Sequence, residues 1–272
     1  LFVSKLLGRK TVFHLHGGSF DAVYKEYHPL KQAAVRFFFR LTDTVIALSS
    51  YWQEFLSHLV SANKIEILPN PIDCAKLSSY SNGILHHRTR SILLLGSLGK
   101  RKGHFDVLKA LPDVLTSYPD TQVYFAGLDE DPRATEKLQE IARQANITDN
   151  INFIGPITGV QKLKLLGQAT IVILPSYGEN MPISVLEGMA AKKPVVSTRV
   201  GAIPEVLGNG SYGMLIDPGD WGELAKDIVY LFDNPNYAKQ LGESAHKQAV
   251  EKWDVSRINM IIDAIYKKHL QN

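Results

Sequence analysis

Short runs of apolar and β-branched residues alternate along the chain with longer stretches of helical periodicity, and this alternation limits the fold more than any other feature of the sequence. The runs are apolar throughout, as expected for strands that are buried on both faces. Such strands occur in parallel sheets that helices cover on each side. The sequence therefore predicts an α/β fold built on doubly wound parallel sheets. The predicted strands are residues 11–15, 44–48, 66–68, 91–95, 122–126, 152–154, 170–174, 194–198 and 213–216.

The predicted strands form two groups, separated by a polar stretch at residues 78–90 with little periodicity. We expect Rossmann-like domains at residues 1–85 and 86–250, and a helix at residues 251–272 that packs across both. The second domain has enough predicted strands for a complete unit, whereas the first has only three. A parallel sheet of three strands leaves apolar faces and edges uncovered. We therefore expect the N-terminal domain to be incomplete, its first strands being supplied by a preceding region or by a partner subunit.

Composition excludes several classes of protein. With 30 basic against 27 acidic side chains, the net charge of +3 is too small for a dedicated nucleic-acid binder. No apolar run of the sequence approaches the roughly 20 residues that cross a bilayer, and no signal-peptide pattern opens it. The single cysteine, Cys74, permits no disulfide within the chain, which favours a reducing, cytoplasmic compartment. Residues 1–40 nevertheless carry a net charge of +5, so we expect an anionic partner near this segment.

One stretch of this basic segment has two interpretations. Residues 33–41 contain three consecutive phenylalanines between Arg36 and Arg40. Aromatic bulk beside arginine is typical of a surface that contacts anionic lipid, which would make the protein peripheral on the inner face of the membrane. The same pattern is typical of a helix whose apolar face packs on a sheet. The sequence leaves both interpretations open.

Two glycine-rich stretches differ in their context. Residues 208–213 have the spacing of a dinucleotide-binding motif, but that motif works only between a strand and the start of a helix. Here a helical turn precedes it and a strand follows, which favours an ordinary turn and argues against NAD. Residues 91–103 instead run from a buried strand into a glycine turn with three basic residues, ahead of a helix. Backbone N–H groups and a lysine can bind a phosphate there, although three basic residues alone are typical of a solvated turn.

Two glutamates, Glu179 and Glu187, flank the predicted start of a helix within residues 171–190. Their separation of eight residues is about 80° away from alignment on a continuous α-helix. We therefore place Glu179 in the loop before the helix, Pro182 in its first turn and Glu187 further along it. Amide N–H groups that are free at the start of the helix favour a diphosphate there. The two carboxylates can then accept hydrogen bonds from hydroxyl groups at both ends of one elongated ligand.

The segment from Glu179 to Glu187, with Lys102-Gly103 before it and the string VVSTRVGA at residues 195–202 after it, closely resembles the signature of glycosyltransferase family 4. The resemblance extends across nearly the whole chain. Further strings in the family's order are HLHGGSF at 14–20, VIALSSYW at 45–52, ILPNPID at 67–73, LLLGSLGKRKG at 93–103, YFAGL at 124–128 and NFIGPI at 152–157. The resemblance implies the two-domain fold called GT-B. It also implies retaining transfer of a hexosyl unit from a nucleoside diphosphate sugar to an acceptor hydroxyl, with no metal ion or other cofactor.

The resemblance further implies roles for individual side chains. Glu187 would bind the ribose of the donor, Glu179 the transferred sugar near its reacting face, and Lys102 the diphosphate. The loop at residues 153–155 would receive the base. The acceptor would be a saccharide or a lipid-linked molecule in polysaccharide or glycolipid synthesis. The donor-binding set implied in this way is Gly96, Ser97, Arg101, Lys102, Ile154, Asn180, Met181, Pro182 and Glu187.

The chain departs from the family pattern in two places. Family members commonly carry Arg at the position of Ser97, where it pairs with the lysine on the phosphates, so this cation is missing unless Arg101 or Lys100 replaces it. The glycine-rich loop that the family places near its N-terminus, beside donor and acceptor, is absent from this sequence. We therefore expect the chain as given to bind a nucleoside diphosphate without transferring sugar.

Two pairs of histidines need separate interpretations. His14 and His16 point to the same side of a predicted strand, a spacing that suits a metal ion, but no third ligand is evident in the sequence. The resemblance instead puts His16 at a strand end facing the interdomain cleft, where it would join Glu179 as a catalytic residue. A hydrogen-bonded structural histidine is the alternative. His86 and His87 are expected to be exposed linker residues.

Two other functions stay open. A sugar-nucleotide epimerase can use the same fold, although the order of the motifs does not favour it. A non-catalytic nucleotide-sugar-binding module, or one half of a split transferase, would follow if the first strands are absent from the natural protein.

Overall fold

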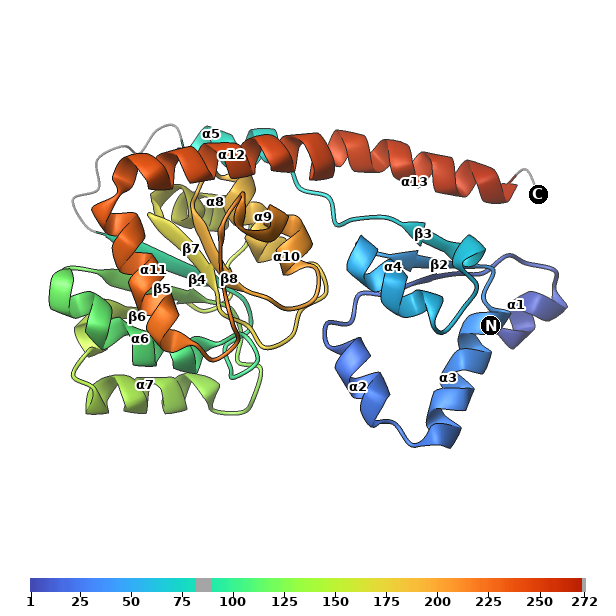
Figure 1. Cartoon of the computed structure of the whole chain (residues 1–272), viewed down its shortest axis with the longest axis horizontal. Helices are drawn as coiled ribbons and strands as arrows, with labels where there is room; N and C mark the ends of the chain where they lie inside the picture. Colours follow the sequence, from blue (N-terminus) through green and yellow to red (C-terminus); the bar gives the residue numbers. More distant parts are fainter. Residues whose placement is uncertain (82–89, 271–272) are drawn as a thin grey trace.

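The computed structural model describes residues 1–81 and 90–270, which form two α/β parts linked along one side by a pair of long helices (Figure 1). The first part contains a three-stranded sheet and the second a six-stranded sheet. Each predicted strand is present, with bounds within one residue of those expected. All neighbouring strands are parallel, so the expected α/β class is confirmed.

The elements of the first part are α1 (Phe2–Leu6), β1 (Val12–His14), α2 (Phe20–Glu26), α3 (Pro29–Leu41), β2 (Thr44–Ala47), α4 (Ser50–Ser57), the 3-10 turn η1 (Ala62–Lys64) and β3 (Ile65–Ile67). The next elements are α5 (Cys74–Ser81), β4 (Ser91–Leu95), α6 (His104–Ser117), β5 (Gln122–Ala126), α7 (Ala134–Gln144), η2 (Thr148–Asn150), β6 (Ile151–Phe153), α8 (Gly159–Gln168) and β7 (Ile171–Leu174). The last elements are α9 (Ile183–Ala190), β8 (Val195–Thr198), α10 (Ile203–Val206), η3 (Gly208–Gly210), β9 (Met214–Ile216), α11 (Trp221–Asp233), α12 (Pro235–Trp253) and α13 (Val255–Leu270).

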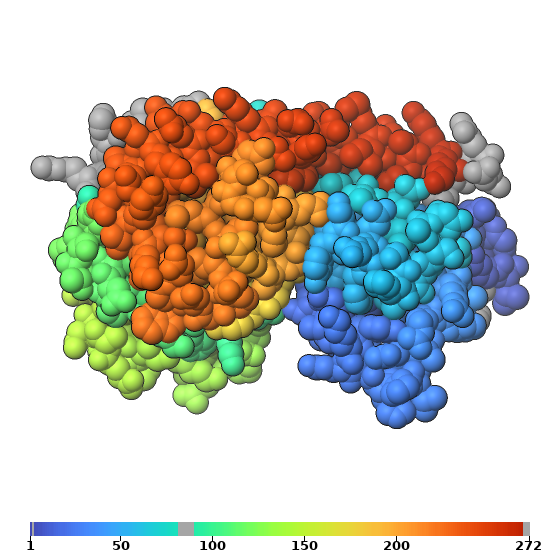
Figure 2. All heavy atoms as spheres, in the orientation of Figure 1, coloured from blue at the N-terminus to red at the C-terminus, as the bar shows by residue number. Residues whose placement is uncertain are grey.

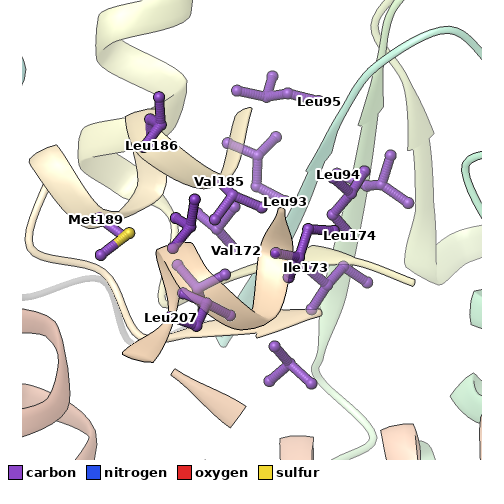
Figure 3. Close-up of a cluster of buried hydrophobic side chains, with 14 of the residues drawn as sticks. Leu93, Leu94, Leu95, Val172, Ile173, Leu174, Val185, Leu186, Met189 and Leu207 are labelled. Atoms are coloured by element: carbon purple, nitrogen blue, oxygen red, sulfur yellow. The ribbon is translucent and has the colours of Figure 1, made fainter. Parts of the chain in front are cut away.

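The six-stranded sheet has the order β6-β5-β4-β7-β8-β9. Its two central strands, β4 and β7, consist almost entirely of leucine, isoleucine and valine, and every residue in them is buried. Figure 3 shows the apolar cluster that these strands form with Val185, Leu186 and Met189 of α9. Burial of one such side chain stabilises the fold by about 1.5–3 kcal/mol. The central strands are therefore a firm base for the loops that follow them.

Helices cover this sheet in two sets. On one side α6 packs against α7 and α11, and on the other α9 packs against α5 and α12, with α8 beside α5. Figure 1 shows α8 and α12 above the sheet and α6 and α7 below it. We expected α5 within a domain at residues 1–85, yet it packs against helices of the second part. Residues 78–81 of the expected linker form its last turn, while the boundary at 85/86, His86 and His87 lie outside the described residues.

The three-stranded sheet of the first part has the order β1-β2-β3. Trp52 and Leu56 of α4 are fully buried and belong to the core of this part. The phenylalanines of α3 differ in environment, because Phe39 is 2% exposed whereas Phe37 and Phe38 are 56% and 39% exposed. The interpretation of residues 33–41 as a packed helix face therefore holds for Phe39, and two aromatic side chains remain at the surface.

The two C-terminal helices contact both parts. α12 packs against α9 of the second part, whereas Ile258 and Ile265 of α13 are buried against Ile46 and Leu68 of the first part. The backbone of Ile72 contacts both helices. Its N–H donates to the carbonyl of Trp253 in α12, and its carbonyl accepts from the N–H of Val255 in α13. The helix expected within residues 251–272 is α13, since α12 continues to Trp253 and the break between the helices follows it. Figure 2 shows that the two parts also contact each other beneath α12 and α13.

Candidate functional site

A cavity of about 820 Å³ opens between the two parts, at the carboxyl ends of β4, β5 and β7. The order of the six-stranded sheet reverses between β4 and β7, because the chain builds β5 and β6 on one side of β4 and then returns to the other side. Open parallel sheets bind ligands at such a reversal, since the loops after the two strands separate there. The first part closes the cavity from the opposite side with His16, Gly18, Leu48 and Asn70.

One wall of the cavity carries the predicted phosphate-binding turn. Lys102 lies at the end of this turn, and its Nζ donates a hydrogen bond of 2.7 Å to Oε1 of Glu179. Gly103, which follows it, has φ of +79°, and a Cβ there would lie 2.0 Å from the carbonyl oxygen of Pro175. Only glycine permits this approach of the turn to the end of β7. The sequence therefore places a lysine and a glutamate from different loops in direct contact.

Arg101 supplies a second cation to this wall. Its Nη2 donates to Oγ of Ser97 at 3.4 Å, and its Nη1 lies 3.9 Å from Oε1 of Glu179. Its Nε pairs with Glu130. Arg101 lines the cavity beside Gly96, Ser97 and Lys102, whereas Lys100 is exposed outside it. The guanidinium of Arg101 therefore lies beside Ser97, the position at which the family pattern has its arginine.

The loop that carries Glu179 is fixed from both parts of the molecule. Asn180 donates from Nδ2 to the carbonyl oxygen of Leu15 at 3.0 Å, and Asn70 donates from Nδ2 to the carbonyl oxygen of Met181 at 2.8 Å. Both bonds join residues of the first part to the second. They orient the backbone between Glu179 and α9, so that Glu179, Asn180 and Met181 all line the cavity.

The segment after β8 packs against the backbone of the Glu179 loop. Gly201 has φ of +53°, and a Cβ at this residue would lie 2.0 Å from the carbonyl oxygen of Glu179. The N–H of Ala202 donates to the carbonyl oxygen of Asn180 at 2.9 Å. We expected Pro182 in the first turn of α9, but it is the N-cap residue with extended ψ of 124°. This geometry agrees with the tendency of proline to precede or begin a helix, since it has no N–H to leave unpaired.

Glu187 projects from α9 into the cavity and is 6% exposed. Its Oε1 accepts a hydrogen bond from Nζ of Lys162, a residue of α8. Burial raises the pKa of the Glu187 carboxyl, and the charge and hydrogen bond of Lys162 act in the opposite direction. Each of the two buried carboxylates is therefore paired with a lysine, Glu179 with Lys102 and Glu187 with Lys162.

The two histidines of the first part occupy different environments. Their ring centroids lie 3.9 Å apart. Burial and the nearby charge of His16 lower the pKa of His14 to about 4, and Nε2 of His14 is buried without a partner among the described residues. His16 is exposed and lines the cavity. Among the described residues, no three His, Cys, Asp or Glu side chains are grouped as metal ligands.

The far end of the cavity differs from the expectation for residues 153–155. Ile154 packs against the hydrophobic core and does not line the cavity, and Phe153 contacts the ring of Phe125. Pro156 and Ile157, which follow them, line the cavity instead. Pro156 and Ile157 therefore form this part of the wall, and the assignment of Ile154 to the donor site stays a prediction.

A second hollow of about 650 Å³ lies on the other side of the Glu179 loop. The first part contributes Asp21 and Tyr51 to it, and the second part contributes Tyr177 and Arg199. Tyr51 donates to Asp21, and Tyr177 donates to Asp106 at 2.7 Å, a bond that raises the pKa of Tyr177 to about 12. Glu179 borders both hollows, so they are adjacent along the same cleft.

Asn70 and Lys162 are polar residues of the cavity that the sequence alone does not mark as part of a site. Asn70 lies within the string ILPNPID, which was noted only for its resemblance, and its link to the Met181 carbonyl becomes visible only when the two parts are brought together. Lys162 is one of two lysines in an amphipathic helix, a pattern typical of a solvated face, and nothing in the sequence marks it as a partner of Glu187. Within the described ranges, no helix is both long enough and apolar enough to span a membrane.

Comparisons with known proteins identify the family of this chain. The family model described as "Glycosyl transferases group 1" matches residues 83–248, and the one described as "Glycosyltransferase Family 4" matches residues 1–76. The chain is 25% identical over 249 residues to a glycogen synthase of Mycobacterium tuberculosis, covering 90% of this chain and 58% of that protein. It is 26% identical over 264 residues to N-acetyl-alpha-D-glucosaminyl L-malate synthase of Bacillus anthracis, covering 94% of this chain and 67% of that protein. The chain thus spans about 58% of the length of the first curated relatives that it matches.

Solved structures resemble the chain over nearly its full length. Anabaena Alr3699/HepE in complex with UDP superposes with a TM-score of 0.83 at 21% identity, covering 98% of this chain and 74% of that chain. Sucrose-phosphate synthase of Thermosynechococcus elongatus also gives a TM-score of 0.83, at 18% identity, covering 99% and 71%. At these identities the likeness establishes a shared fold.

Proposed function

Because the chain belongs to the group 1 glycosyl transferases and has the GT-B fold, we propose that its cleft binds a nucleoside diphosphate sugar and transfers the sugar to an acceptor hydroxyl with retained anomeric configuration. The observation that carries this proposal is the single cavity in which Arg101 and Lys102 lie beside two buried carboxylates, Glu179 and Glu187. The cations suit a diphosphate, and the carboxylates suit hydroxyl groups on either side of it. The structure of the Anabaena relative with UDP-glucose makes a uridine diphosphate sugar the first donor to test.

The order of the strands suggests how the donor lies. Pro156 and Ile157 follow β6 at one end of the cavity and provide an apolar surface for the base. Glu187 would then accept hydrogen bonds from the ribose, and Lys102 would bind the diphosphate at the end of β4. The transferred sugar would lie against Glu179, at the end of β7, with His16 of the first part opposite.

The same side chains suggest how the reaction proceeds. The bond between the anomeric carbon and the diphosphate oxygen breaks, and negative charge develops on the departing diphosphate. Lys102 and Arg101 stabilise that charge, as preorganised donors do in an oxyanion hole. An ammonium group has three N–H donors, so Lys102 can keep its bond to Glu179 while it binds a phosphate oxygen. No metal ion is invoked.

The acceptor would approach on the face that the diphosphate leaves. Its hydroxyl oxygen bonds to the anomeric carbon, and its proton passes to the departing phosphate oxygen, so Glu179 positions the sugar and forms no covalent intermediate. The second hollow, with its tyrosines and carboxylates, has the polar and aromatic groups that suit a saccharide. Relatives include a glycogen synthase and a phosphatidyl-myo-inositol mannosyltransferase of Mycobacterium leprae, which supports either a saccharide or a lipid-linked acceptor.

A donor screen tests this function. The chain is heated with UDP-, GDP- and ADP-sugars, and the proposal expects one group of donors to raise the midpoint of thermal unfolding. Where that donor is transferred to a saccharide or lipid-linked acceptor, the product is examined by NMR, and its anomeric configuration should match that of the donor. Inversion would contradict the retaining mechanism. Epimerisation of the donor without acceptor would favour the epimerase alternative, and no protection by any donor would overturn the proposal.

A further inference from the structure

The pair formed by Lys162 and Glu187 is built from two helices that are far apart in sequence. Lys162 lies on α8 and Glu187 on α9, and the two side chains meet at the wall of the cavity. The Lys162 side chain is 32% exposed and that of Glu187 is 8% exposed, so the lysine reaches from the surface to a carboxylate that is nearly enclosed. The pair therefore belongs to the cavity and differs from the surface ion pairs of the protein.

Lys162 is the cation that acts on Glu187. The other two cations of the cavity are engaged elsewhere, Lys102 with Glu179, and Arg101 with Glu130 and Ser97. A carboxylate that is buried without a cation loses its hydration and tends to take up a proton. Without Lys162 the Glu187 carboxylate would be left in that condition.

The geometry also leaves part of Glu187 for a ligand. Lys162 binds Oε1, and a carboxylate has a second oxygen that can accept from a hydroxyl group. We propose that Lys162 is a positioning residue of the nucleotide site, which keeps the Glu187 carboxylate ionised and turned toward the ribose hydroxyls of the donor. This inference rests on the proposed function, because it takes Glu187 as the ribose contact.

The proposal predicts a dependence on pH that a purely structural ion pair would not give to ligand binding. Burial raises the pKa of Glu187 and Lys162 opposes this, so loss of Lys162 raises the pKa further. Among the described residues, the other titratable side chains that line the cavity are those of Glu179, Lys102, Arg101 and His16. On the opposite side of α9, His246 of α12 bonds to the Ala190 carbonyl, and burial lowers its pKa. As the pH is lowered, nucleotide binding by Lys162→Met should therefore begin to weaken at a higher pH than binding by the wild type, because Glu187 takes up its proton earlier.

The experiment is a calorimetric titration of the full chain with UDP, GDP and ADP, followed by the tightest of the three and its 2′-deoxy analogue. Lys162→Met is expected to weaken the ribonucleotide about tenfold, and to weaken the deoxynucleotide less. Lys162→Arg should restore most of the affinity. Lys164→Met changes an exposed lysine of the same helix and should bind as the wild type does. Titrations at a series of pH values follow the shift on the Glu187 carboxyl.

A double-mutant cycle with Glu187→Gln distinguishes action through Glu187 from other causes. If Lys162 acts through this carboxylate, Lys162→Met adds little to the effect of Glu187→Gln. Equal affinity of Lys162→Met and wild type for the ribonucleotide, or fully additive effects in the cycle, would overturn the inference while leaving the proposed function intact. Failure of the wild type to bind any of the three nucleotides would instead overturn the proposed function, and this inference with it.

Discussion

Replacing Glu179 by glutamine removes one negative charge from the cavity while keeping the size of the side chain. Glu179 is 6% exposed, and its Oε1 lies 2.7 Å from Nζ of Lys102. In the proposed complex this carboxylate contacts the transferred sugar and no part of the nucleoside. Glu179→Gln should therefore weaken binding of the nucleotide sugar and leave binding of the bare nucleoside diphosphate unchanged or stronger.

The magnitude follows from the two contacts of the carboxylate. A hydrogen bond to a charged group contributes about 1.5–3 kcal/mol, which corresponds to roughly 10- to 150-fold in affinity. The loss of this contact lowers the affinity for the nucleotide sugar and leaves that for the nucleoside diphosphate unaffected. The second contact has the opposite effect, because Lys102 is released from its carboxylate and becomes a stronger partner for the phosphates. The ratio of the two dissociation constants, for nucleotide sugar and for nucleoside diphosphate, should thus rise by about tenfold or more.

The assay is a pair of calorimetric titrations, with UDP-glucose and with UDP, on the wild type and on Glu179→Gln. Glu187→Gln is the matched comparison, because it changes the other buried carboxylate of the cavity. It should weaken both ligands by similar factors, since both contain the ribose. Thermal unfolding of each variant checks that it is folded, because removal of one partner from a buried ion pair can cost about 3–5 kcal/mol. If Glu179→Gln weakens UDP as much as Glu187→Gln does, the assignment of the two glutamates is refuted.

Three further predictions concern other parts of the molecule. In Gly201→Ala the added Cβ would lie 2.0 Å from the carbonyl oxygen of Glu179, so it should displace that carbonyl and lower the affinity for nucleotide sugars. Gly8→Ala, also at positive φ but with no atom within 4 Å of the added Cβ, should bind as the wild type does. Equal binding by the two variants would contradict this account of the Glu179 loop. Burial lowers the pKa of His104 to about 4, so the neutral ring stabilises the fold fully above pH 6.5 and this stabilisation is lost as the pH falls toward 4. In His104→Phe the free energy of unfolding should therefore fall less over this pH range than in the wild type. Unfolding midpoints measured across that range check it, and parallel curves for variant and wild type would count against it. Arg40→Glu should reduce sedimentation with anionic vesicles at low salt, and is preferable to a change at Arg36, which donates to Tyr24; no vesicle binding by the wild type would eliminate the membrane interpretation.

Much of the fold follows from local sequence. The runs at β4 and β7 are uninterrupted apolar stretches of the length of a strand, and nothing in them competes with the assignment. The turn at residues 208–213 was also identified from its neighbours, because α10 precedes it and β9 follows. By contrast, the sequence predicts α5 at the end of the first domain. Its packing against α8 and α9 depends on contacts between residues far apart in the chain, which a local sequence pattern cannot indicate.

The site was predictable only in part, for a similar reason. Glu179, Lys102 and Glu187 could be named because the loop, the turn and the helix that carry them each have a local signature. Their pairing could not, since Lys102 meets Glu179 across two loops and Glu187 meets Lys162 across two helices. The role of Ile154 stays a prediction, because a strand that ends at Phe153 does not reveal how the side chains after it divide between the core and the cavity. Such choices are made by tertiary packing.

The most direct test of the account is a calorimetric titration of the chain with UDP, GDP and ADP, beside the same titration of Lys102→Met. The account predicts one binding site per chain for at least one of these nucleotides, and a loss of about tenfold or more in affinity when the cavity lysine that we propose to bind the phosphates is replaced. The absence of heat with all three nucleotides, or binding that Lys102→Met leaves unchanged, would contradict the claim that this cleft is a nucleotide-sugar site.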